Sequence, residues 1–140
     1  MKSLNLIALT LLLALASLMS AYAARAETIE INANSFAAVA YSPATGRYYY
    51  AHNYSSRAEA EQHALRGLNA WDGRIAGWVK GGFFALAVSY DGGWRTGWSY
   101  GEGASNGDAA AYALRDFRAQ GRGARVVVCL SSDGQYIYKR

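Results

Sequence analysis

One phrase occurs twice in this 140-residue chain, and the repetition constrains the fold more than any other feature. The segment FAAVAYSPATGRYYYAHNY begins at Phe36, and FFALAVSYDGGWRTGWSY begins at Phe83. The similarity continues beyond the aromatic residues, where QHALRGL in the first copy aligns with AYALRDF in the second. Self-similarity of this kind is typical of tandem structural units. The sequence therefore predicts two related units, at about residues 36–80 and 83–131.

Both units show the same order of predicted elements. An apolar run, a turn and an aromatic run indicate a β-hairpin, with Pro43 and Gly46 in the first turn and Asp91-Gly92 in the second. A serine with an acidic residue three positions later then marks a helix start, at Ser56 and at Ser105. Small apolar residues follow at helical spacing, and the units end in the strand-like runs RIAGWVK and RVVVCLS.

Two such β-β-α-β units predict an α+β fold. One unit cannot cover both faces of its own sheet, whereas two units can share one hydrophobic interior. We therefore expect an antiparallel sheet core, built as one larger sheet or as a pair of sheets, with the two helices packed on it. The segments TIEINAN near the start and QYIYKR at the end each suit one additional strand.

The first 26 residues have the layout of a secretory signal peptide. Lys2 precedes an almost wholly apolar run over residues 4–19, and two small-x-small cleavage signals follow, AYA ending at Ala23 and ARA ending at Ala26. The apolar run is short for a membrane span, and no later run is long enough for one. We expect cleavage after one of these alanines and a single exported domain, residues 27–140, that is periplasmic or secreted. An uncleaved N-terminal anchor is the alternative.

The charge of the predicted mature chain argues against nucleic acid as a partner. The whole chain has 14 Lys and Arg against 10 Asp and Glu, a formal net charge of +4. Lys2 and Arg25 lie in the predicted signal peptide, so 12 basic residues (14 less 2) remain against 10 acids, a net charge of +2. Nucleic-acid binding rests on clustered cations, which this small excess and an export signal do not favour.

The residues that most often carry chemistry form no convincing catalytic or metal-binding set. The chain has two histidines, His52 and His63, and one cysteine, Cys129. Neighbours on a strand point to opposite faces, so His52 and Asn53 are not a ready pair, and these three residues cannot make a closed zinc site. Cys129 is interpreted most simply as a small buried side chain. We expect no catalytic residues, metal or cofactor, with a Cys129–His52 pair as the one enzyme candidate.

Aromatic residues crowd the second strand of each predicted hairpin. Because strand side chains alternate between faces, both faces of these strands carry rings, and one face must meet solvent, another layer or a partner. Tyrosine and tryptophan are frequent at recognition surfaces, although cross-strand ring pairing within a sheet is the structural alternative. The candidate binding residues are Arg47, Tyr48, Tyr50, Tyr54, Trp94, Arg95, Trp98 and Tyr100.

The block FAAVAYSPATGRYYYAHNYSSRAEAEQHAL, followed by WVKGGFFALAVSYDGGWRTGW, resembles a bacterial family described as domain of unknown function 4189. The resemblance extends from Phe36 to about Ser131 and implies a small, mostly secreted domain without an activity to assign to positions here. It also implies cysteines near the helix ends and before the second hairpin. The matching neighbourhoods of this chain hold other residues instead, namely Leu68, Asn69, Phe83 and Ala124.

The function that we expect is a non-catalytic, exported binding module of the bacterial cell envelope, with a protein, cell-wall or glycan partner. A periplasmic immunity or inhibitor protein, acting against a toxin or a hydrolase, is the alternative. A thiol-dependent enzyme that uses Cys129 is the remote third interpretation.

Overall fold

The structure is a computed structural model that describes residues 30–100 and 104–140, and for residues 98–100 it describes the backbone alone. The chain divides into residues 1–30 and a second unit, Ile31–Arg140. The predicted signal peptide, residues 1–26, lies outside the described residues. None of the described helices has the length and apolar character needed to cross a membrane.

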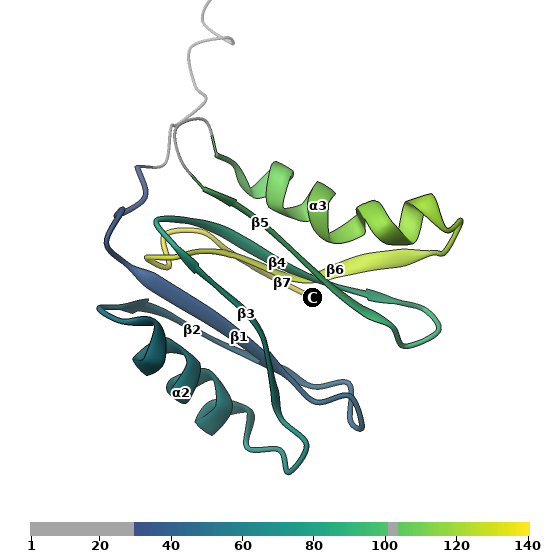
Figure 1. Cartoon of the computed structure of the whole chain (residues 1–140), viewed down its shortest axis with the longest axis horizontal. Helices are drawn as coiled ribbons and strands as arrows, with labels where there is room; N and C mark the ends of the chain where they lie inside the picture. The colour runs from purple at the N-terminus through teal and green to yellow at the C-terminus, as the bar shows by residue number, and fades with distance from the viewer. Residues whose placement is uncertain (1–29, 101–103) are drawn as a thin grey trace, which may run out of the picture. The chain divides into compact units, whose positions relative to one another are not determined.

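Two helices and two antiparallel sheets make up residues 31–140 (Figure 1). In chain order the elements are β1 (Phe36–Tyr41), β2 (Tyr48–Tyr54), α2 (Arg57–Leu68), β3 (Arg74–Lys80), β4 (Gly82–Ser89), β5 (Trp94–Tyr100), α3 (Asn106–Ala119), β6 (Ala124–Ser131) and β7 (Ile137–Lys139). The first sheet has the strand order β2-β1-β3, and the second has the order β5-β4-β6-β7. The predicted α+β class is confirmed, with a pair of sheets rather than one larger sheet.

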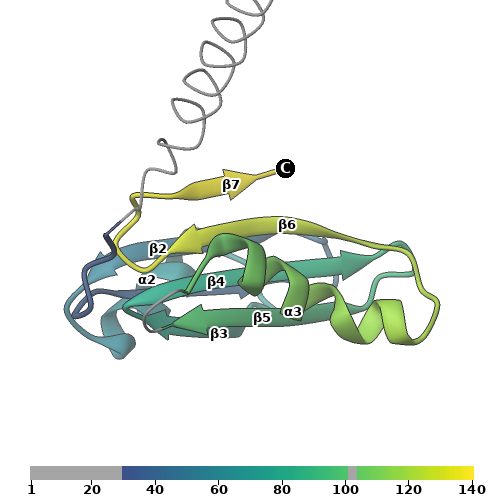
Figure 2. The same ribbon diagram turned by 90° about the horizontal axis from the view of Figure 1, so that it is seen from above.

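Both halves of the chain have the same order of elements. In each, a hairpin is followed by a helix and a third strand, and the first strand of the hairpin lies between the other two in the sheet. β7 extends the second sheet and is the strand expected from QYIYKR (Figure 2). Residues 30–34, the described part of TIEINAN, form no strand. Shared topology alone does not establish that the halves are copies of one unit, which stays a prediction.

The two sheets face each other, and their strands alternate between an inner and an outer face (Figure 1). In β1, Val39 points to the inter-sheet core and Ala40 points to α2; in β4, Leu86 points to the core and Ala87 points to α3. The inter-sheet core consists of Ala37, Val39, Val79, Phe84, Leu86, Val127, Val128 and Leu130. Burial on both faces explains why β1 and β4 are almost continuously apolar.

One helix covers the outer face of each sheet (Figures 1 and 2). Both helices begin at the predicted caps, where the hydroxyl of Ser56 accepts from the N–H of Glu59 and that of Ser105 accepts from the N–H of Asp108. Small side chains then allow close contact with the sheet. The buried helical residues are Ala60, Ala64 and Leu68 in α2, and Ala109, Ala113 and Phe117 in α3.

Candidate functional site

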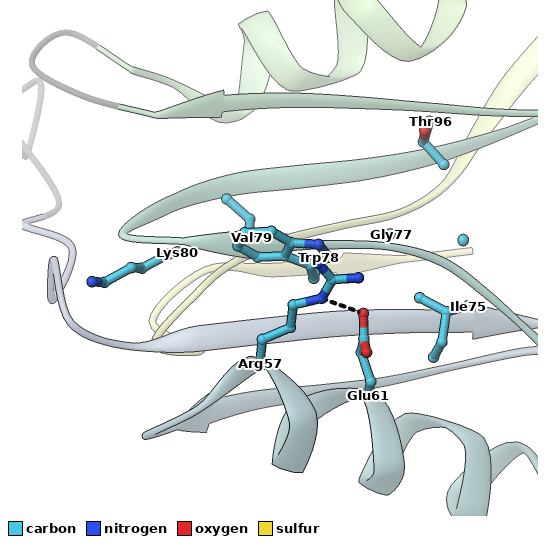
Figure 3. A pocket seen from close by; sticks show the side chains of 9 residues that line it. Arg57, Glu61, Ile75, Gly77, Trp78, Val79, Lys80 and Thr96 are labelled. Carbon is cyan, nitrogen blue, oxygen red and sulfur yellow. Dashed lines mark hydrogen bonds and ion pairs between the residues drawn. The ribbon is translucent and has the colours of Figure 1, made fainter.

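A groove of about 790 Å³ runs along β3, an edge strand of the three-stranded sheet (Figure 3). Its lining comes from three elements: Arg57 and Glu61 of α2, residues 75–80 of β3, and Thr96 of β5. Ligand pockets in proteins commonly have volumes of roughly 300–1,000 Å³. The groove is therefore large enough for a small ligand or for a short segment of another chain.

The groove lies where edge strands of the two sheets come together. β3 lies next to β4 and β5 of the second sheet, and at the other edge of its sheet the hydroxyl of Tyr48 in β2 donates to the carbonyl of Val127 at 3.0 Å. Among the strands that the structure describes, β3 pairs only with β1, and β5 pairs only with β4. Two strand edges therefore flank the groove.

An edge strand has backbone groups without a partner strand. Pairing between β3 and β1 is antiparallel, so alternate N–H and C=O groups of β3 point toward β1 and the others point away from it. The groove is lined by six consecutive residues of this strand. Its wall therefore offers backbone donors and acceptors, with an irregularity at Ala76, where the pairing with β1 shifts by one residue.

β3 lies close to the second sheet because residue 77 is a glycine. A Cβ atom at Gly77 would lie 2.6 Å from the ring of Phe84, which is almost completely buried in the inter-sheet core. Any larger residue at this position would require either the strand or the Phe84 ring to move. The close contact holds the edge of β3 in place on a rigid support, which lowers the cost of ordering it when a ligand binds.

Trp78 is the aromatic residue of the groove, and 37 % of its surface is exposed. The guanidinium of Arg57 lies 4.6 Å from the centroid of its ring, a cation–π contact. Arg57 is oriented in turn by Glu61, one helical turn further on, with 2.7 Å between Nε and Oε1 (Figure 3). The ring therefore presents a partly free surface beside a guanidinium that is already positioned.

Positive charge dominates the surroundings of the groove. β3 begins with Arg74 and ends with Lys80, and both side chains are exposed. Arg57 and Glu61, the one acid among the described lining residues, form an ion pair and add no net charge, so the positive charge comes from Arg74 and Lys80. A ligand that carries negative charge is favoured by this arrangement.

The tyrosines and the tryptophan predicted from β2 and β5 have mainly structural contacts. Tyr48, Tyr50 and Trp94 pack against the inter-sheet core, and Trp94 lies 4.9 Å from Tyr41 between ring centroids. Tyr54 stacks on His63 of α2 at 4.5 Å. β2 and β5 are edge strands of different sheets.

Both predicted arginines contact elements of their own half. Arg47 donates to the carbonyl of Leu68 at the end of α2, at 3.2 Å, and Arg95 lies over the ring of Phe117 in α3. The backbones of Trp98 and Tyr100 pair with β4, but their side chains lie outside the described residues.

Cys129 and His52 belong to different sheets and have different neighbours. The thiol of Cys129 is buried on the face of β6 that α3 covers, 3.7 Å from the carbonyl of Asn106, and burial raises its pKa to about 11. His52 stacks on Tyr50 and lies against the backbone at Gly134. No cluster of metal-ligating side chains occurs within residues 30–100 and 104–140.

Trp78 and Arg57 were missed by the reasoning from sequence. Trp78 stands alone in RIAGWVK, a run that predicts a strand and nothing more. Arg57 is the first residue of α2, where the sequence pattern indicates only the helix cap at Ser56. The available signal for Trp78 as a binding residue was a single large aromatic side chain among small neighbours in a strand. This signal does not indicate that the first residue of α2 lies beside it.

A family model with the description "Domain of unknown function (DUF4189)" matches residues 36–130. The matched region runs from the first residue of β1 almost to the end of β6 and includes every described lining residue of the groove. Searches of curated proteins and of solved structures found no match.

Proposed function

This chain belongs to the DUF4189 family, and we propose that its domain is a non-catalytic binding module, exported to the bacterial envelope, that holds its ligand in the β3 groove. The observation that carries the proposal is the exposed ring of Trp78, set beside the Arg57 guanidinium along an unpaired strand edge. Export rests on the signal-peptide pattern of residues 1–26.

The residue types in the groove support binding. Tryptophan and arginine are the side chains that most often dominate the free energy of binding at interfaces, particularly when a rigid framework holds them. Trp78 and Arg57 are held in this way, the former by β3 and the latter by Glu61. A module of this kind needs contact area and charge rather than a reactive group.

The test compares two tryptophan variants of residues 27–140. Trp78→Ala removes the ring from the groove, whereas Trp71→Ala removes a ring that is 90 % exposed in the turn between α2 and β3 and does not line the groove. Co-sedimentation with envelopes isolated from the producing bacterium measures binding. We expect Trp78→Ala to weaken binding at least tenfold, as is typical of a dominant interface residue, and Trp71→Ala to bind normally.

Thermal unfolding of both variants serves as the control for folding. If Trp78→Ala is folded and binds envelopes as well as the unchanged protein does, the groove is not the binding site and the proposal is wrong.

A further inference from the structure

We infer that the ligand of this groove is an extended, acidic peptide segment that pairs with β3 as an additional strand. The inference rests on the proposed function and specifies the chemistry of its ligand. Three features carry it: the unpaired edge of β3, the walls on its two sides, and the cations at its two ends.

The edge of β3 is a template for a strand. It is seven residues long, which at a rise of about 3.3 Å per residue is enough for a peptide of five to seven residues. Six of these residues line the groove consecutively, so a peptide lying in it runs beside the backbone rather than across it. Addition of a strand to an exposed sheet edge is a recurrent way of binding extended peptides.

The walls of the groove contact the two faces of such a strand. Side chains of a bound strand alternate between faces. On one side they meet Trp78 and Arg57, next to α2, and on the other side they meet Thr96 of β5 (Figure 3). Backbone pairing thus supplies affinity, and the two walls supply selectivity for alternate side chains.

The charges select an acidic occupant. Arg74 and Lys80 lie at opposite ends of β3, so acids near both ends of a paired strand meet a cation whichever way the strand runs. Opposite charges on directly facing strand residues stabilise the pairing, and like charges destabilise it. Arg57 lies along the same groove as an ion pair with Glu61 and therefore adds a hydrogen-bonding guanidinium but no net charge.

The same charges disfavour a second copy of this chain as the occupant. Antiparallel pairing of two β3 strands about Gly77 places Arg74 of each copy opposite Lys80 of the other. Parallel pairing in register places each cation opposite its own equivalent. Edge lysines are a common protection against this kind of self-association. The charges of β3 therefore disfavour pairing with a second copy and favour pairing with an acidic strand.

The experiment measures binding of synthetic peptides to residues 27–140 by isothermal titration calorimetry. The probe is acetyl-DTVTVTE-amide, an extended peptide with an acid at each end. One control is acetyl-KTVTVTK-amide, and the other is the acidic peptide with alternate backbone amides N-methylated, which removes donors and blocks strand pairing. We expect the acidic peptide to bind at least tenfold more tightly than either control and to slow amide exchange within residues 75–79.

A pair of charge reversals tests the position of the peptide. Lys80→Glu should weaken binding of the acidic peptide and strengthen binding of the lysine peptide, whereas Arg118→Glu, an equal change of sign on the exposed surface of α3, should change neither. Equal binding of the N-methylated and unmodified peptides, or insensitivity to Lys80→Glu, overturns the inference.

The outcomes separate this inference from the proposed function. If Trp78→Ala abolishes envelope binding but the acidic peptide does not bind, the peptide inference is wrong and the binding module stands with a ligand of another kind. If the peptide binds as described but envelope binding is insensitive to Trp78→Ala, strand addition stands and the proposed function is wrong. Slowed exchange in β3 on raising the protein concentration alone would identify a second copy as the occupant and overturn the inference.

Discussion

Glycines set the distances between the layers of this domain because they have no side chains. At Gly97 of β5, a Cβ atom would lie 2.2 Å from the backbone nitrogen of Ala113 and 2.4 Å from the carbonyl oxygen of Ala109. Real Cβ atoms do not approach backbone so closely, and the backbone of a helix cannot give way as a flexible side chain can. α3 therefore lies directly on the strand because residue 97 is a glycine.

Replacement of this glycine should loosen the contact between α3 and the second sheet. We expect Gly97→Ala to lower the free energy of unfolding by about 1–3 kcal/mol, the usual cost of overpacking. Gly107→Ala is the matched control, because a Cβ there meets only the Ser105 hydroxyl at 3.6 Å and alanine favours helix by up to about 1 kcal/mol. Urea unfolding measures both. Equal effects of the two substitutions would contradict the close contact.

The Cys129 thiol should be unreactive in the folded protein. Burial raises its pKa to about 11 from an ordinary value of 9.0, so the thiolate fraction at pH 8 falls roughly a hundredfold. We expect iodoacetamide to modify the native protein at least that much more slowly than the urea-unfolded protein, as followed by mass spectrometry. Rapid alkylation of the native protein would instead restore the thiol-dependent enzyme as a serious alternative.

The raised thiol pKa also affects stability. The folded state keeps the proton to a higher pH than the unfolded state does. This contribution to stability is therefore complete below about pH 9 and is lost as the pH rises toward about 11.

Buried serines at strand ends connect the turns to one another. The hydroxyl of Ser42, at the end of β1, donates to the carboxylate of Asp72 at 2.6 Å and thereby joins the first hairpin turn to the turn before β3. In the second half, Ser89 donates to Asp91, which also pairs with Arg122 after α3. Each serine–aspartate contact thus fixes where a helix returns to its sheet.

These aspartates should make the domain sensitive to acid. The Ser42 hydroxyl lowers the pKa of Asp72, and the Arg122 guanidinium together with the Ser89 hydroxyl lowers the pKa of Asp91, from an ordinary value of 3.8. A lowered pKa means that the folded state binds protons less readily than the unfolded state. The stabilising contribution of these two carboxylates is therefore present above about pH 4 and is lost as the pH falls below 3.8.

The melting temperature, measured from pH 6 down to pH 2, tests this prediction. We expect it to fall on the acid side of pH 4, and Asp72→Asn to lower it at pH 6 while reducing its dependence on pH. An unchanged pH dependence in Asp72→Asn and in Asp91→Asn would show that these contacts do not contribute.

The two halves of the domain share one core. Val39 and Val79 of the first sheet pack with Phe84, Leu86 and Leu130 of the second. Separation of the sheets would expose the inner faces of both, and an apolar side chain of this size contributes roughly 1.5–3 kcal/mol when fully buried. Each half on its own would keep only the cluster between its helix and its sheet.

We accordingly expect residues 27–80 and residues 82–140 to be unfolded as separate fragments. Circular dichroism and the dispersion of amide proton signals in NMR spectra measure this directly. The intact domain should unfold in a single cooperative transition. A separate fragment with a sharp thermal transition of its own would show that its helix and sheet suffice, and that the inter-sheet core is not essential.

Local sequence patterns predict most of the secondary structure of this domain. The turn residues, the serine caps and the small residues at helical spacing are signals between neighbours in the chain, and the structure contains the hairpins and helices that they predict. Two points could not be read in this way. The sequence allowed one sheet or two, and it did not indicate that β2 and β5 lie at edges of different sheets.

The amino-acid sequence determined which segments form strands and helices, because hydrogen bonds, caps and alternation act over a few residues. It also carried the family pattern over residues 36–130. The tertiary structure alone decided that β3 is left with an open edge and that Arg57 lies over Trp78 from another element. The physical reason is that the groove forms between elements that are far apart in the sequence. Their packing depends on contacts that no local sequence pattern encodes.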